Sequence, residues 1–192
     1  MRTMNGKLLA ILLAAAFSAA GSAAAADFSG AYVGGDVGIN NSSTSGTYTT
    51  SPAVAPFYGV EGGYGWDVGG NVLLGVDGHV DSYQDTTHTP AGDYGSHAYG
   101  LGLKVGVPID SLMPYARLGY DHTQGTGALS GFSSGSANSG VGLMYKFAPS
   151  WSLEGEWSAT TPAAAGLKLK SNTLNFGLNY HFDSPSGSPG RR

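Results

Sequence analysis

Three ionisable side chains occupy alternate positions in the segment GVDGHVDS: Asp77, His79 and Asp81. In a β-strand, side chains two residues apart point to the same face, so these three groups would lie in one row. Such a row could bind a divalent metal, or a carboxylate could polarise the histidine for general-base catalysis. It could also be a structural set of charges that fixes the shape of a narrow polar interior.

A metal site at this position would need more ligands than the segment supplies. The segment offers one imidazole from one strand, so closing the site would require Asp36, Glu61 or other ligands from neighbouring strands. The chain also contains no cysteine, which excludes disulfides, thiol catalysis and cysteine-based metal sites. We therefore predict that the row is structural, and that the chain has no catalytic residue, no metal and no cofactor.

The composition is unusual for a soluble domain. Glycine accounts for 32 of 192 residues, more than twice its ordinary share, and charged residues for only 11%, less than half of theirs. The net charge of -4 argues against a nucleic-acid partner, which requires a basic surface. No apolar run after residue 26 is long enough for a membrane-spanning helix.

The two ends of the chain differ from its middle. Residues 1–26 have the features of a secretory signal peptide, with a basic start, an apolar stretch over 8–17 and small residues before Asp27. We therefore expect an exported chain. Residues 183–192 are rich in Ser, Pro and Gly, and we expect them to form a disordered periplasmic tail.

The part between these ends shows a period of two in eight segments. In each segment one face is apolar and uncharged, whereas the other carries glycine and nearly all the charges. The segments are 31–40, 57–67, 72–81, 96–107, 115–122, 138–147, 151–160 and 171–182. This alternation predicts β-strands. A soluble sandwich would show a face rich in Lys, Glu, Thr and Ser, whereas a glycine-rich face suits the narrow interior of a barrel.

The connections between these segments alternate between long and short. The long connections are rich in Ser, Thr, Gly and Pro and cover residues 41–56, 83–95, 123–137 and 161–170. Outer-membrane barrels have short periplasmic turns and longer outside loops. We therefore predict an all-β fold, an eight-stranded antiparallel transmembrane up-and-down β-barrel over residues 27–182, with the long connections outside and both ends of the barrel in the periplasm.

The two faces of the strands predict two different surroundings. Aromatic residues fall on the apolar faces near both strand ends, as in the two girdles of membrane barrels. They are Tyr58, Tyr64, Trp66, Tyr99, Tyr120, Tyr145, Phe147, Trp151, Trp157, Tyr180 and Phe182. The opposite faces would form a lumen charge network, because a buried charge needs a partner. That network would comprise Asp36, Glu61, Asp77, His79, Asp81, Lys104, Arg117, Asp121, Lys146, Glu154 and Glu156.

Four segments resemble a known family: DFSGAYVGGDVG (27–38), PYARLGY (114–120), YKFAPSWSLEGEW (145–157) and LNFGLNYHF (174–182). They are similar to opacity-like surface antigens, which resemble the transmembrane domain of outer membrane protein A. The resemblance implies a non-enzymatic structural protein of the bacterial outer membrane, in contact with lipid and lipopolysaccharide. It also implies folding by the barrel-assembly machinery, and loops that act as a surface antigen or adhesin towards a host or surface ligand.

Two other functions stay open. A small porin-like channel could pass water and ions if the glycine-rich lumen is under-filled. An envelope enzyme that modifies lipid A would, by resemblance to outer-membrane deacylases, pair a histidine with a serine on the lipid-facing side. His97 and His122 fall on that side as rim residues, and the sequence places no serine beside them. Lys168 and Lys170 fall above the outer rim, where they could contact lipopolysaccharide phosphates.

Overall fold

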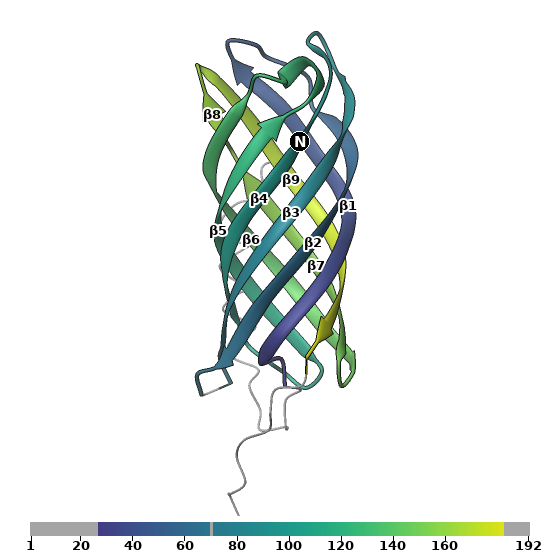
Figure 1. Ribbon diagram of the computed structural model, residues 1–192, viewed down its shortest axis with the longest axis vertical. Helices are drawn as coiled ribbons and strands as arrows, with labels where there is room; N and C mark the ends of the chain where they lie inside the picture. Colours follow the sequence, from purple (N-terminus) through teal and green to yellow (C-terminus); the bar gives the residue numbers. More distant parts are fainter. Residues whose placement is uncertain (1–26, 70, 183–192) are drawn as a thin grey trace, which may run out of the picture.

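The computed structural model describes residues 27–69 and 71–182, which form a closed antiparallel β-barrel (Figure 1). Its eight long strands are β1 (Gly30–Gly46), β2 (Ala53–Asp67), β3 (Leu73–His88), β4 (Gly92–Gly106), β5 (Leu112–Gly125), β6 (Ser133–Ala148), β7 (Trp151–Thr160) and β9 (Leu167–His181). The two-residue strand β8 (Ala163–Ala164) pairs only with β9, and η1 (Gly127–Leu129) is one turn of 3-10 helix. The predicted eight-stranded barrel is confirmed. The predicted signal peptide (1–26) and tail (183–192) lie outside the described residues.

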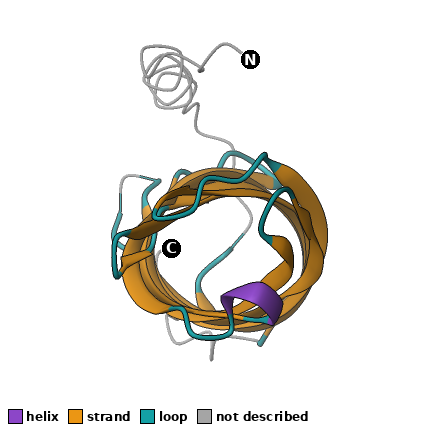
Figure 2. Ribbon diagram, turned by 90° about the horizontal axis from the view of Figure 1, so that it is seen from above, coloured by secondary structure: helices purple, strands orange, loops and turns teal. Residues whose placement is uncertain are grey.

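The barrel closes because β1 pairs on one side with β2 and on the other with β9. Val33 of β1, for example, lies opposite both Gly62 and Tyr180. Figure 2, a view from above, shows the strands as a continuous ring. Each of the eight long strands therefore has two neighbours, which satisfies the backbone hydrogen-bonding groups that lipid cannot satisfy. Among the described residues, no helix is long and apolar enough to cross a membrane.

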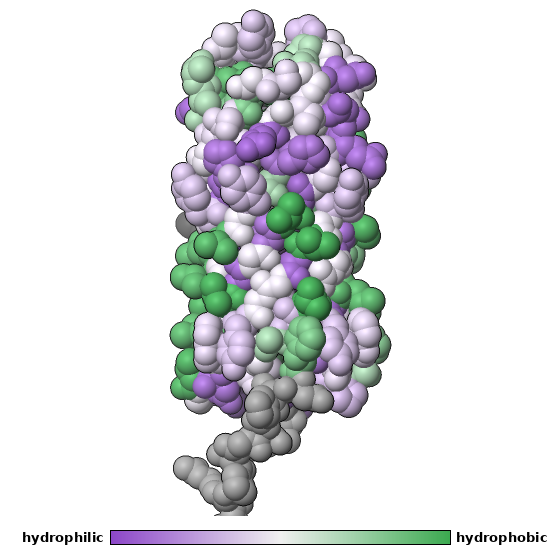
Figure 3. Space-filling model, viewed as in Figure 1, coloured by the Kyte–Doolittle hydropathy of each residue, from purple (hydrophilic) through white to green (hydrophobic). Residues whose placement is uncertain are grey.

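Side chains alternate between the two surfaces of the barrel wall as the sequence predicts. Leu103 and Leu118 point outward and are 64% and 67% exposed, whereas their neighbours Lys104 and Arg117 point inward and are buried. Figure 3 shows apolar side chains gathered around the lower half of the barrel and a polar surface above them. An apolar exterior around a charged interior is typical of a barrel surrounded by lipid.

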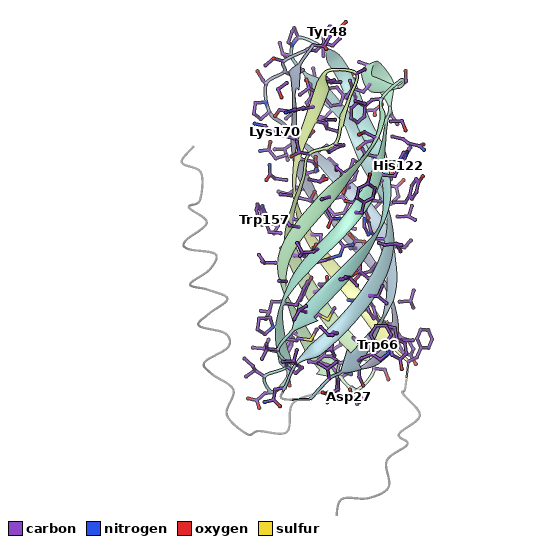
Figure 4. All side chains as sticks on the ribbon, turned by 90° about the vertical axis from the view of Figure 1, so that its left-hand side faces the viewer. Asp27, Tyr48, Trp66, His122, Trp157 and Lys170 are labelled. Atoms are coloured by element: carbon purple, nitrogen blue, oxygen red, sulfur yellow. The ribbon has the colours of Figure 1, made fainter. Side chains whose placement is uncertain are left out.

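The predicted girdle residues lie on the outer wall of the barrel, and two of them can be followed in Figure 4. Figure 4 places Trp66 near the lower edge and Trp157 about halfway up the wall. The girdle side chains are exposed, except for Tyr180, which is half-buried between Trp151 and Phe182, with ring centres 5.1 and 5.2 Å away. Aromatic rings at two levels of an outer wall are typical of the two interfaces of a membrane.

The strands extend farther beyond the belt than the sequence predicts. Most of the residues predicted as long connections belong to β-strands, so that prediction was wrong. Their Ser and Thr side chains do not suit lipid, but strands can continue into water, and threonine favours strand backbone. The connections that remain are L1 (47–52), L2 (89–91), L3 (126–132) and L4 (161–166). We call this end of the barrel the loop end, and the opposite end the turn end.

Candidate functional site

The predicted lumen residues lie on the inward face of the barrel wall and form layers along its axis. At the turn end, an apolar layer comes first, formed by Phe28, Leu73, Met113, Tyr115 and Met144, which are 2–5% exposed. Lys146 lies beside this layer, where its Nζ donates to the backbone carbonyl oxygen of Asp27. This apolar layer was not predicted, because Phe28 and Met113 precede the segments in which the period of two is visible in the sequence.

Lys104 is the centre of the next layer. Its Nζ lies 3.2 Å from Glu61 Oε2 and 3.2 Å from Glu154 Oε1, and its side chain is 4% exposed. The ammonium group also lies 5.4 and 5.1 Å from the ring centres of Tyr32 and Tyr115, which is within cation–π distance. One lysine from β4 therefore connects carboxylates from β2 and β7 across the lumen.

Arg117 makes the second set of ion pairs. Its Nη2 and Nε lie 2.6 and 3.0 Å from Asp77 Oδ1, and the Asp77 side chain is fully buried. Its Nη1 lies 3.9 Å from Glu156 Oε1. The Tyr115 hydroxyl oxygen lies 2.8 Å from Glu156 Oε2 and also contacts Glu154 Oε1, and its single proton can be donated to either carboxylate, which joins this layer to that of Lys104. Buried charges of both signs are thus held in one connected network, as burial requires.

His79 belongs to the same network, and its hydrogen bonds bear on the metal binding or general-base catalysis that its spacing could serve. Arg117 Nη2 lies 2.8 Å from His79 Nδ1. A guanidinium can only donate, so Nδ1 accepts this bond and the ring proton lies on Nε2, 3.3 Å from Asp121 Oδ1. The lone pair that a metal ion or a general base would use is therefore occupied. Within residues 27–69 and 71–182, no group of three His, Asp or Glu side chains is placed to hold a metal ion.

A small polar cavity of about 40 Å³ lies in the lumen, bordered by Asp36, His79, Asp81 and Asp121 among others. A side chain at Gly59 would overlap the carboxylates of Asp36 and Asp81, so glycine is required here for their close approach. The volume is enough for about one to three water molecules. The cavity is too small for a larger ligand.

Two aromatic pairs fill the lumen between this cavity and the loop end. Phe57 and Tyr83 stack with ring centres 5.1 Å apart, and the Tyr83 hydroxyl donates to Asp81 Oδ2 at 3.2 Å. Farther out, His88 and Tyr94 stack at 3.6 Å. Together with the apolar layer at the turn end, these pairs fill most of the length of the interior with side chains, as expected for a barrel of eight strands.

On the outer wall, the structure brings together a pair that the sequence analysis had excluded. Ser133 Oγ of β6 lies 3.0 Å from His122 Nε2 of β5, so the prediction that no serine lies beside an outward histidine was wrong. Eleven positions separate the two residues, and only the pairing of β5 with β6 places them side by side. The Tyr99 ring lies against His122 at 5.2 Å, while the carboxylate of the adjacent Asp121 points into the lumen and cannot orient His122. His97 is exposed on the same wall.

Lys168 and Lys170 are exposed on β9, on the outward face. Figure 4 shows Lys170 above the level of Trp157, towards the loop end. Both lysines therefore stand beyond the apolar belt, beside the Ser45 and Ser43 positions of β1. This is the level at which the charged head groups of a surrounding lipid layer would lie.

Hydrogen bonds tie each of the four loops to a neighbouring loop or to the end of a neighbouring strand around the mouth of the barrel. L1 donates to L4 from Thr47 N to Gly166 O at 3.2 Å, and to L2 from Ser51 N to Thr89 O at 3.0 Å. L3 donates from Thr126 N to the carbonyl oxygen of Gly95, just beyond L2, at 3.0 Å. L4 is joined to the start of β6, next to L3, because Ser134 Oγ donates to Ala163 O at 2.8 Å. The loops are therefore held as one surface.

Comparisons with known proteins agree with this architecture. The family model for the outer membrane protein β-barrel domain matches residues 9–182. Among curated proteins, none matches the chain significantly. The crystal structure of Neisserial surface protein A is 19% identical, with a TM-score of 0.53, and the match covers 80% of this chain and 98% of that one. At this identity the likeness shows the fold alone.

Two further solved structures match most of the chain. Ail, the attachment invasion locus protein of Yersinia pestis, is 15% identical, with a TM-score of 0.49, and the match covers 79% of this chain and 99% of that one. The N-terminal β-barrel domain of Pseudomonas aeruginosa OprF is 21% identical, with a TM-score of 0.45, and coverages of 76% and 97%.

Proposed function

Because the chain belongs to the outer membrane protein β-barrel domain family, we propose that it is a non-enzymatic structural barrel whose loop end faces outside as a surface antigen or adhesin. The observation that carries this proposal is the contrast between a lumen filled by ion pairs and a continuous surface of four joined loops. A filled lumen stabilises the wall, whereas loops on a rigid scaffold are the part of a protein that recognises partners.

Surface recognition is tested by replacing L1 and L3 with glycine–serine segments of equal length. An antiserum raised against refolded residues 27–192 is expected to bind intact cells that carry the original chain, and to bind the variant at least about fivefold less. Attachment of the same bacteria to cultured epithelial cells is expected to fall in parallel. Heat-dependent migration on gels, which reports the folded barrel, is expected to stay unchanged.

The matched control replaces the turn between Gly106 and Leu112, which lies at the opposite end of the barrel. This variant is expected to bind antiserum on intact cells as well as the original chain does. If changes at the turn end reduced binding to intact cells while changes in L1 and L3 did not, the proposed orientation would be reversed.

We also propose that Lys168 and Lys170 bind lipopolysaccharide phosphates as point charges. Their exposure beyond the apolar belt supports this. Exchanging both for glutamate is expected to weaken binding of lipopolysaccharide to the refolded barrel by about tenfold in low salt, and by less in high salt, because exposed charges are screened. Unchanged binding at low salt would contradict the proposal.

A small channel is the second candidate, and the cavity beside Asp36, Asp81 and Asp121 is the observation that favours it. Single-channel recording of refolded residues 27–192 in planar lipid tests it, beside a variant with Asp77, His79 and Asp81 all changed to asparagine. We expect both proteins to be silent, because the Phe57–Tyr83 pair and the apolar layer block the path. Steady conductance that the variant alters would support a pore.

A further inference from the structure

A cavity of about 490 Å³ opens at the loop end, far from the charged lumen layers. We call it the mouth pocket; its lining includes Tyr48, Ala91, Leu129, Phe132, Ala164 and Leu167. These residues come from L1, L2, L3 and L4 and the strand ends beside them, so all four loops contribute. Figure 4 shows Tyr48 at the extreme of this end.

The floor of the mouth pocket is apolar although it lies outside the lipid belt. Leu129, Phe132 and Leu167 are 8–9% exposed, and they pack with Tyr94 and Leu169 in one hydrophobic cluster. The same three side chains border the pocket, so the outer surface of this cluster faces the cavity rather than more protein. Apolar surface that faces an open concavity in water is typical of a binding site.

Hydrogen bonds of the loops to one another and to strand ends keep the mouth pocket in shape. Thr47, which lines the pocket, donates through its backbone to Gly166 of L4 at 3.2 Å. Leu129 N donates to Thr126 O and Phe132 N to Leu129 O, at 3.0 and 2.8 Å, so the floor segment is also fixed internally. Small-molecule sites are usually preformed in this way and have volumes of about 300–1,000 Å³.

The lining defines the chemistry of the occupant. None of its residues is charged, so an ionised ligand would lose its hydration without gaining a partner. Thr44, Thr47 and Tyr48 supply the side-chain hydroxyl groups of the lining, where one hydroxyl or carbonyl oxygen of a ligand could be matched. We propose that the mouth pocket binds a small uncharged molecule with an aromatic or short aliphatic body and one such polar group.

A lipid acyl chain is a poorer occupant than a molecule arriving from outside. Figure 4 places Tyr48 beyond Lys170, and Lys170 beyond Trp157, so the pocket stands well above the apolar belt. An acyl chain would have to leave the hydrocarbon layer and pass the polar wall to reach it.

The inference rests on the proposed function only in requiring that the loop end faces outside.

Methyl NMR of refolded residues 27–192 in lipid nanodiscs tests the proposal with 1-naphthol as the probe. Saturable shifts are expected at Leu129, Leu167 and Ala91. The charged analogue 1-naphthalenesulfonate is expected to bind at least about tenfold more weakly. Methyl groups of Leu103 and Leu118, which face lipid, report simple partitioning of the probe and are expected to shift without saturation.

Two variants separate binding in the mouth pocket from general effects. Gly131→Trp fills the pocket, since Gly131 lines it and its Cβ position is open, and naphthol affinity is expected to fall at least about tenfold. Ala163→Trp places the same ring on exposed L4 outside the lining, and affinity is expected to be retained. Equal binding of the sulfonate, or shifts that survive Gly131→Trp, would overturn the proposal. So would contacts between lipid methylenes and Leu129 before the probe is added.

This assay needs no cells, so its failure would leave surface recognition by the loops intact. Conversely, loss of the antiserum and attachment results would remove the proposed function without changing the shifts at Leu129 and Leu167. The two claims can therefore fail separately.

Discussion

Changing Leu103 to arginine is expected to lower the free energy of unfolding in lipid by about 2–4 kcal/mol. Leu103 points outward from β4 in the middle of the apolar belt, between Leu101 and Val105, and is 64% exposed. A guanidinium placed there must lose its hydration or distort the surrounding lipid. Urea unfolding of the refolded barrel in vesicles, followed by tryptophan fluorescence, measures the change.

Tyr48→Arg is the matched control. Tyr48 is also 64% exposed, but it lies in L1 beyond the polar part of the wall. A charge at this position stays in water, and the expected change is below about 0.5 kcal/mol, as for an ordinary surface substitution. If both variants lost the same stability, the belt around Leu103 would not face lipid.

Changing Arg117 to glutamate is expected to cost at least about 3–5 kcal/mol, because it leaves buried carboxylates without a counter-charge. Asp77, whose side chain is fully buried, loses its bidentate partner, and Glu156 loses its nearest guanidinium. The new carboxylate adds repulsion to both. The same unfolding assay measures the loss, and impaired insertion during refolding is expected to accompany it.

A double variant shows whether the loss comes from unpaired charge or from disturbed packing. Arg117→Met combined with Asp77→Leu removes both members of the pair and puts apolar side chains in their place. It is expected to recover the part of the stability that Arg117→Met loses by leaving Asp77 unpaired, since an apolar pair can replace a buried ion pair, whereas Glu156 lacks its guanidinium in both variants. If the double variant were as unstable as the single one, the Arg117–Asp77 pair would not be the cause.

The fold could be predicted from the sequence because strand alternation is a local property. Leu103 and Lys104 are adjacent, so their opposite environments are visible in the sequence without knowledge of any partner strand. Strand ends were harder to predict, because the outer part of β3 changes from apolar alternation to residues such as Thr86 and Thr87 that suit water. Backbone pairing continues there, since it depends on the neighbouring strand rather than on hydropathy.

The inward position of the charged residues could be predicted, but their partners could not. Lys104 of β4 contacts Glu61 of β2 and Glu154 of β7, and this choice depends on the register and curvature of several strands. The same limit applies to His122 and Ser133, which no short motif connects. The mouth pocket was not predictable, because its walls come from four separate loops.

The ring of loops also limits how the exposed surface can vary. Insertions in L1 would displace the backbone of two other loops, since Thr47 of L1 is bonded to Gly166 of L4, and Ser51 to Thr89 of L2. Under the proposed surface-antigen role, variation is therefore expected as substitutions at outward side chains such as Tyr48, or as matched changes in several loops together. A peptide copied from a single loop would lack those neighbours, and as a vaccine it would be expected to raise antibodies that bind the intact barrel poorly.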